Sequence, residues 1–131
     1  CFCGSGSLGI ECISRGCKDV HFIDNSYESM EITTKNCKIM NVENFYKFYR
    51  SDFRNKNLPA LKVDLFFLDP PYEKFKIINI LKTLYKLNLI KEKALGVLEV
   101  SKSNQIEELN GYSILKERKV SNSLFYFIIK N

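Results

Sequence analysis

The chain has 131 residues, of which 45% are hydrophobic, 13% aromatic and 27% charged, and its formal net charge is +5. This composition excludes a disordered chain, and the counts of six Gly and three Pro exclude a collagen-like or mucin-like chain. No apolar run approaches the length of about 18 residues that spans a bilayer, so we expect no membrane association. The length and composition predict a single globular domain over residues 1–131.

Apolar periodicity predicts that helices and strands alternate along the chain. The predicted helices cover residues 5–15, 27–40, 75–87 and 104–109. The predicted strands cover residues 20–23, 44–49, 63–68, 95–100, 112–119 and 123–130. Strands that are separated by helices favour parallel pairing, whereas the last two strands have no helix between them and are expected to pair antiparallel. The sequence therefore predicts an α/β fold, with a mostly parallel sheet flanked by helices.

The cysteines are odd in number and crowd into the first third of the chain, at Cys1, Cys3, Cys12, Cys17 and Cys37. No pair has the C-x2-C spacing of a zinc site, and the chain has a single histidine, His21. We expect the cysteines to be reduced and to act as small buried apolar residues in a reducing cytoplasm. The alternative is that they form a structural metal site or a disulfide. His21 is expected to be a strand residue with a satisfied ring.

A glycine-rich turn, Phe-Cys-Gly-Ser-Gly-Ser-Leu-Gly at residues 2–9, leads into the first predicted helix. Glycine allows a sharp bend and a close approach to a ligand, and a helix N-terminus offers backbone N–H groups to a polar or anionic moiety. The spacing of Gly4, Gly6 and Gly9 also matches the dinucleotide-binding pattern G-x-G-x-x-G. A helix entry with purely structural glycines would look similar.

Two carboxylates follow predicted strands. Asp24 ends the strand at residues 20–23, where a carboxylate is suited to accept two hydrogen bonds from a ribose diol. Asp52 follows the strand at residues 44–49 and is a candidate partner for an adenine amino group, with Phe53 beside that ring. The alternatives are a helix N-terminal acid next to Ser26 and an ordinary loop at residues 52–53.

The apolar strand at residues 63–68 stops at Asp69-Pro70-Pro71-Tyr72. Two prolines remove two backbone donors and stiffen the turn, so that carbonyl oxygens stay available beside a carboxylate and an aromatic ring. This arrangement suits an exocyclic amine on a planar base. Asp69 and the Pro70 carbonyl would accept its two N–H bonds, and Tyr72 would stack on the base, which is worth about 1–3 kcal/mol. The tetrad therefore predicts amino methylation rather than hydride transfer.

Two segments resemble the RsmD family: residues 4–16, and residues 64–72 with the sequence D-L-F-F-L-D-P-P-Y. The resemblance covers essentially the whole chain. Three further features match the family: the Ser-Arg-Gly sequence at residues 14–16 that ends the first helix, the acidic residue Asp24, and the helix that carries Asn36. The resemblance implies a Rossmann-like class I methyltransferase that uses S-adenosylmethionine on the guanine N2 amine of small-subunit ribosomal RNA. The expected catalytic residues are Asp69, Pro70, Pro71 and Tyr72. The expected cofactor-binding residues are Phe2, Gly4, Ser5, Gly6, Asp24, Asn25, Asp52 and Phe53, and no metal is expected.

The chain departs from the family pattern at two places. Cys1 stands where the family's first strand ends, so we expect that strand and an N-terminal extension to be missing from the sequence. Ser121-Asn122 replaces the family's Tyr-Gly pair before the last strand.

The resemblance implies ribosomal RNA or an assembling small ribosomal subunit as the partner of a monomeric, cytoplasmic enzyme. Candidate RNA-binding residues are Lys74, Lys76, Lys82, Lys86, Lys91 and Lys93, which as an alternative form a solvated helix face. Three other functions stay open. They are a DNA adenine-N6, cytosine-N4 or protein-glutamine methylase, a nicotinamide-dependent oxidoreductase, and a truncated non-catalytic remnant.

Overall fold

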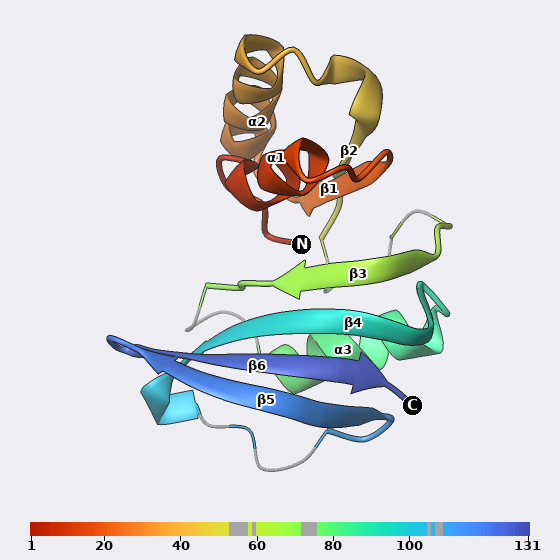
Figure 1. The fold of residues 1–131 in the computed structure, drawn as a ribbon, viewed down its shortest axis with the longest axis vertical. Helices are drawn as coiled ribbons and strands as arrows, with labels where there is room; N and C mark the ends of the chain where they lie inside the picture. The colour runs from red at the N-terminus through yellow and green to blue at the C-terminus, as the bar shows by residue number, and fades with distance from the viewer. Residues whose placement is uncertain (53–57, 59, 72–75, 105, 107–108) are drawn as a thin grey trace. The chain divides into compact units, whose positions relative to one another are not determined.

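The structure is a computed structural model that describes residues 1–52, 58, 60–71, 76–104, 106 and 109–131. The chain forms two compact units, Cys1–Pro59 and Ala60–Asn131 (Figure 1). Each unit has its own sheet, so that each candidate motif is positioned by a separate set of elements.

The first unit alternates helices with two parallel strands. Its elements are α1 (Ser7–Ser14), β1 (Val20–Asp24), α2 (Tyr27–Ile39), the 3-10 helix η1 (Glu43–Phe45) and β2 (Tyr46–Arg50). The register of β1 and β2 runs from Val20 opposite Tyr46 to Asp24 opposite Arg50. Because the strands are parallel, their carboxyl ends meet at one edge of this sheet.

Aromatic side chains on the two strands build much of the core of the first unit. The ring of Phe22 in β1 is 3% exposed and lies 5.6 Å from the ring of Tyr46 and 6.3 Å from the ring of Phe48 in β2. Ile13 of α1 and Cys37 of α2 are buried as well. These contacts place both helices on the strands whose ends carry the candidate residues.

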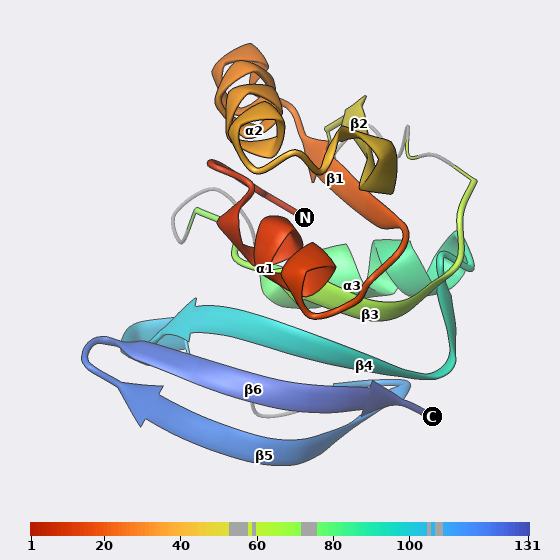
Figure 2. The same cartoon turned by 45° about the horizontal axis from the view of Figure 1, so that its top comes forward.

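The second unit is a four-stranded sheet with one helix. Its elements are β3 (Val63–Leu68), α3 (Ile77–Lys86), β4 (Ile90–Ser101), the 3-10 helix η2 (Lys102–Asn104), β5 (Tyr112–Val120) and β6 (Ser123–Lys130). The strand order is β3-β4-β6-β5 (Figure 2). β3 and β4 are parallel, and β6 pairs antiparallel with both β4 and β5.

Helix α3 is strongly amphipathic and covers one face of this sheet (Figure 1). Ile80, Leu81 and Leu84 recur at the spacing of one helix face and are at most 3% exposed. From the sheet, Leu98 and Ile128 are fully buried. In β3, Phe66 and Leu68 are buried as well, and their burial fixes the register of this strand and therefore the position of the turn that follows it.

The α/β fold, with parallel strands first and an antiparallel pair at the C-terminus, is confirmed. Strand β4 begins five residues earlier than predicted because it contains an irregularity: Val63 is opposite Ile90, whereas Leu65 is opposite Leu95. The prediction of a helix at residues 104–109 is wrong for its described part, since the 3-10 helix ends at Asn104 and neither Ile106 nor Leu109 is helical. Residues 105, 107 and 108 lie outside the described residues. Within the part of the chain that the structure describes, no helix is long and apolar enough to cross a membrane.

Candidate functional site

The glycine-rich turn is bound to the end of β1. The backbone N–H of Phe2 donates to the carbonyl of Ile23 at 2.8 Å, and the N–H of Gly6 donates to the carbonyl of Cys3 at 2.8 Å. Gly6 is the N-cap of α1 and has a left-handed φ of 78°. A Cβ atom at this position would lie 2.7 Å from Cγ2 of Thr33, so that only glycine fits between the turn and α2.

Asp24 connects this turn to the start of α2. Its side chain is buried, with 9% exposure, and Oδ2 accepts the backbone N–H of Gly4 at 3.3 Å while Oδ1 accepts the backbone N–H of Ser26 at 3.0 Å. Ser26 in turn caps α2, because its hydroxyl accepts the N–H of Ser29 at 3.2 Å. Oδ1 keeps a second lone pair for a ligand hydroxyl, whereas Oδ2 also accepts a weak hydrogen bond from the thiol of Cys3 at 4.0 Å. The structure thus brings Gly4 and Asp24 together, with exposed Asn25 beside them.

Two side chains of α2 that sequence analysis did not assign to the site hold the turn from its other side. Thr33 is fully buried, and its hydroxyl donates to the carbonyl of Gly4 at 3.1 Å. The amide of Asn36 donates to the carbonyl of Ser5 at 2.9 Å. Polar residues three apart lie on the same face of a helix, and this spacing was the available signal.

Cys3 completes the packing of the turn. Its sulfur lies 3.8 Å from the hydroxyl of Thr33 and 4.0 Å from Oδ2 of Asp24. Burial raises the pKa of the Cys3 thiol, and the negative charge of Asp24 adds to this effect. Cys3 is therefore a protonated thiol that packs against Thr33.

Asp52 lies near the same sheet edge. The backbone N–H of Ser51 donates to the carbonyl of Asp24 at 3.0 Å, which ties the end of β2 to the end of β1. Asp52 follows directly and is half-buried. Its predicted partner Phe53 lies outside the described residues.

In the second unit, the Asp-Pro-Pro turn directly follows β3. Asp69 and Pro71 are exposed and Pro70 is buried, whereas Tyr72 lies outside the described residues. Partial desolvation raises the pKa of Asp69, and the negative charge of Glu99 raises it further. Glu99 comes from the neighbouring strand β4, one residue after Leu98, which is opposite Leu68. A carboxyl group with a raised pKa, at a turn whose two prolines have no backbone N–H, can accept hydrogen bonds and is a better proton acceptor than an ordinary aspartate.

The candidate RNA-binding lysines fall into different environments. Lys76, Lys82, Lys86 and Lys93 are exposed, and Lys74 lies outside the described residues. Lys91 pairs with Asp64, with Nζ at 2.9 Å from Oδ1 and 3.0 Å from Oδ2. The charge of Lys91 is therefore already compensated by a neighbour.

His21 lies in β1 as expected, but its ring is only partly satisfied. Nε2 is 3.2 Å from Oδ2 of Asp19, and the ring lies 5.7 Å from that of Tyr49. Nδ1 is buried and has no hydrogen-bond partner among the residues that the structure describes.

The chain is similar to proteins of one family. The family model of conserved hypothetical protein 95 matches residues 1–129. The ribosomal RNA small subunit methyltransferase D of Buchnera aphidicola subsp. Baizongia pistaciae is 27% identical over all of this chain and 67% of its own length. The protein of the same name from Haemophilus influenzae is 25% identical over 89% of this chain and 63% of its own length.

Solved structures show the same fold. A conserved hypothetical protein of Streptococcus pyogenes is 28% identical, with a TM-score of 0.91 over 99% of this chain and 82% of that protein. The expected Rossmann-like class I methyltransferase fold is therefore confirmed. The chain spans about two thirds of the length of the curated relatives. With residues 1–129 matched by one family model, the chain belongs to the family of conserved hypothetical protein 95, which is the RsmD family that its sequence resembles.

Proposed function

We propose that the protein transfers a methyl group from S-adenosylmethionine to the exocyclic N2 amine of a guanine in small-subunit ribosomal RNA. The observation that carries this proposal is the Asp69-Pro70-Pro71 turn at the end of a parallel strand, in a chain whose family is that of small-subunit rRNA methyltransferase D. The names of the Buchnera and Haemophilus relatives support ribosomal RNA as the substrate.

The first unit has features that fit the cofactor. The open space around Gly4, where a Cβ atom would meet no other atom within 4 Å, leaves the turn accessible. Asp24 is the proposed partner of the ribose hydroxyls, with a lone pair of Oδ1 left for one of them, and Asp52 is suited to the adenine amine. When bound, S-adenosylmethionine supplies a methyl group that is activated by its positively charged sulfur.

The second unit has features that fit the target amine. The lone pair of a guanine N2 amine is delocalised into the ring, which makes the nitrogen a poor nucleophile. Hydrogen bonds from its two N–H groups to Asp69 and to the Pro70 carbonyl localise that lone pair and orient it. Methylation leaves the nitrogen positively charged, and Asp69, with its raised pKa, is suited to accept the proton that is then released. We expect Tyr72 to stack on the base.

A nicotinamide-dependent oxidoreductase has no use for the Asp-Pro-Pro turn, and this turn is what favours amino methylation over hydride transfer. DNA and protein amines share the chemistry that the turn would recognise. A methyl-transfer assay with ribosomal RNA, DNA and protein as acceptors therefore distinguishes these substrates.

The test measures transfer of labelled methyl groups by the full-length protein to ribosomal RNA, small ribosomal particles, DNA and protein. We expect label in ribosomal RNA as N2-methylguanine. Asp69→Ala removes one of the two acceptors for the amine and should lower kcat by about 10²–10³-fold, the scale found for loss of one preorganised hydrogen-bonding group.

The matched control is Asp64→Asn, since Asp64 lies in β3, the strand before the turn, is exposed and contacts Lys91 instead. It should leave the rate unchanged. Full activity of Asp69→Ala would overturn the assignment of this residue, and label in DNA or protein alone would overturn the proposed substrate.

A further inference from the structure

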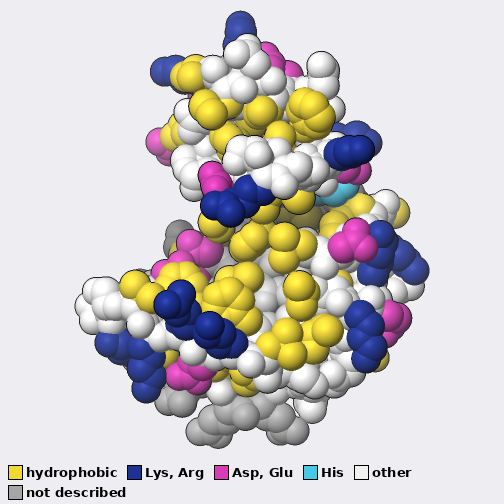
Figure 3. All heavy atoms as spheres, viewed as in Figure 1, with side chains coloured by type: hydrophobic (Ala, Val, Ile, Leu, Met, Phe, Trp, Pro, Cys, Tyr) yellow, Lys and Arg dark blue, Asp and Glu magenta, His cyan; other side chains and the backbone are white. Residues whose placement is uncertain are grey.

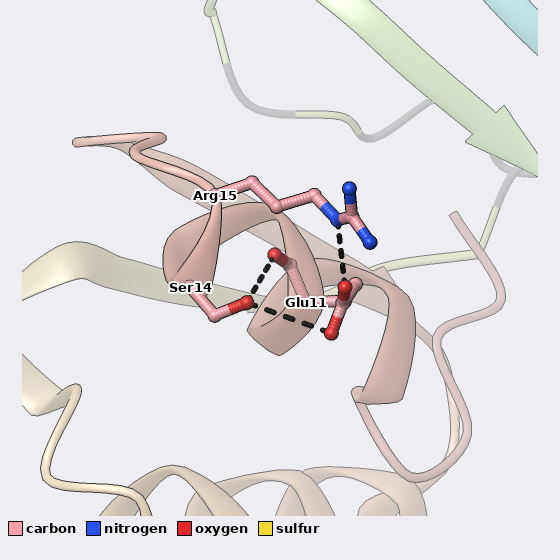
Figure 4. A network of polar contacts seen from close by, with 3 residues as sticks. All are labelled: Glu11, Ser14 and Arg15. Carbon is pink, nitrogen blue, oxygen red and sulfur yellow. Dashed lines mark hydrogen bonds and ion pairs between the residues drawn. The ribbon is translucent and has the colours of Figure 1, made fainter.

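The last turn of α1 is closed by a surface network of three residues (Figure 4). Nε of Arg15 donates to Oε1 of Glu11 at 2.6 Å, and the hydroxyl of Ser14 donates to the backbone carbonyl of Glu11 at 2.9 Å. The side chains of Arg15 and Glu11 are 78% and 58% exposed. This network anchors the helix end beside two cysteines that the proposed methyl transfer does not use.

Helix α1 ends in a Schellman motif. Gly16 has a left-handed φ of 101°, its N–H donates to the carbonyl of Ile13 at 2.9 Å, and the N–H of Cys17 donates to the carbonyl of Cys12 at 2.9 Å. This motif brings the first and the last of its six residues together, and their side chains commonly make an apolar contact. In this chain both residues are cysteines.

Backbone geometry permits a bond between the two sulfurs. With a hydrogen bond of 2.9 Å between Cys17 N and Cys12 O, covalent geometry keeps the two Cα atoms within about 6.8 Å of each other. Disulfides occur at Cα separations of about 4.4–6.8 Å. Cys12 and Cys17 can therefore be joined without unwinding the helix end.

The two thiols differ in accessibility. Both are free, with Cys17 exposed and Cys12 half-buried. Burial raises the pKa of the Cys12 thiol, and a side-chain hydrogen bond with Cys17 raises it further. Cys17 is therefore the thiol that meets a reagent from solvent, and Cys12 is the neighbour within reach of it.

We propose that Cys12 and Cys17 form a dithiol site that a low-molecular-weight disulfide, such as oxidised glutathione, converts to an intramolecular disulfide. The Cys17 thiolate attacks one sulfur of the reagent, whose S–S bond breaks and releases one thiolate. Cys12 then loses its proton to solvent and attacks the Cys17 sulfur, which releases the second thiol. Two protein thiols are oxidised and one reagent disulfide is reduced to two thiols.

The experiment treats the folded protein with excess oxidised glutathione and measures its intact mass and its non-reduced tryptic peptides. We expect the loss of two hydrogens without a stable glutathione adduct. Since trypsin cleaves after Arg15 and Lys18, the new disulfide should join the peptide that ends at Arg15 to the peptide of residues 16–18.

Variants separate the two thiols. Cys12→Ser should leave Cys17 as a stable mixed disulfide with glutathione, because no second thiol is present to displace the glutathione. Cys17→Ser should abolish the reaction at this site. Cys3→Ser is the matched control, because Cys3 lies in the same tryptic peptide as Cys12, and it should leave the intramolecular disulfide unchanged.

A second measurement on the wild-type protein does not depend on the folding of any variant. A trivalent arsenical, which binds two adjacent thiols, should slow alkylation of both Cys12 and Cys17 at least tenfold. Two stable glutathione adducts, a disulfide that still forms in Cys12→Ser, or alkylation of both thiols at the unprotected rate would overturn the proposal.

Discussion

Two aspartates, each at the carboxyl end of a parallel strand, have different surroundings. Asp24 is buried and accepts two backbone N–H groups, those of Gly4 and Ser26. Asp69 is more exposed, yet partial desolvation and the nearby charge of Glu99 raise its pKa. The same residue type at the same kind of position is therefore suited to steady hydrogen bonding in one unit and to proton uptake in the other.

The raised pKa of Asp69 makes its ionisation unfavourable for the folded state. The free energy of unfolding should fall as the pH rises from the unfolded-state pKa of about 3.9 to the higher folded-state value, and the cost is complete above that value. Asp69→Asn removes the charge, so we expect this variant to be more stable than the wild type at pH 7 and equally stable at pH 3. Chemical denaturation at the two pH values measures the difference. An equal gain at both pH values would show that desolvation of the charge is not the cause.

Gly6 is constrained by both its backbone and its neighbour. Gly6→Ala should cost about 1–2 kcal/mol for the left-handed backbone and more for the overlap with Thr33. Gly4→Ala is the matched control in the same turn, since Gly4 also has a positive φ but its Cβ position is empty. Urea denaturation should show the larger loss of stability for Gly6→Ala. Equal losses would contradict the role of the contact with Thr33.

Gly4, Gly6 and Asp24 can be predicted from the sequence because glycines and strand-end acids have recognisable spacing. The contribution of Thr33 cannot, because its burial depends on how α2 packs against the turn. Nor can the influence of Glu99 on Asp69, because these two residues are far apart in the sequence. Long-range packing determines both features, and local pattern does not encode it.

At the scale of elements, β4 shows where strand prediction loses accuracy. Its apolar part agrees with the strand predicted at residues 95–100, and in the structure Leu98 and Val100 alternate with less buried residues. Its polar start, Lys91-Glu92-Lys93, lacks that alternation and contains a left-handed residue, Lys93, with a φ of 62°. Pairing with β3 extends the strand across this irregularity, and only tertiary structure supplies that pairing.

The middle of β4 has no room for a side chain at Gly96. A Cβ atom there would overlap the ring of Phe66 and would lie 2.8 Å from Cγ1 of Ile128. Gly96→Ala should therefore reduce the free energy of unfolding by about 1–3 kcal/mol, as overpacking does.

Phe66→Leu alone creates a cavity, but in combination with Gly96→Ala it should recover part of the loss. A double-mutant cycle by urea denaturation measures this coupling. Strict additivity of the two changes would rule out the predicted overlap with Phe66 as the cause.

At the scale of the whole molecule, composition and periodicity were enough to predict the α/β class and the antiparallel C-terminal pair. They did not predict that the strands would divide between two sheets, one in residues 1–59 and one in residues 60–131. The net charge of +5 permits a polyanionic partner, but charge alone does not distinguish free cations from paired ones. The pairing of Lys91 with Asp64 provides that distinction for one residue.

If RNA is the partner, its affinity should fall with salt, because bound cations release counterions from phosphates. Exposed Lys82 is a candidate for such a contact. Lys82→Ala should lower the slope of log K against log[salt] by about 0.7–0.9, whereas Lys91→Ala should change it less because Asp64 already compensates that charge. RNA binding measured across a salt series gives both slopes, and a larger effect for Lys91→Ala would contradict the prediction.

The bonds that tie the glycine turn to β1 and α2 have a thermodynamic consequence. Ordering a flexible backbone costs about 1–2 kcal/mol per residue in conformational entropy. A turn that is already fixed by the hydroxyl of Thr33 and the amide of Asn36 is spared much of that cost when a ligand arrives. Substitution of Thr33 or Asn36 would therefore weaken ligand binding, because the turn would become flexible before the ligand binds, although no contact to the ligand itself is removed.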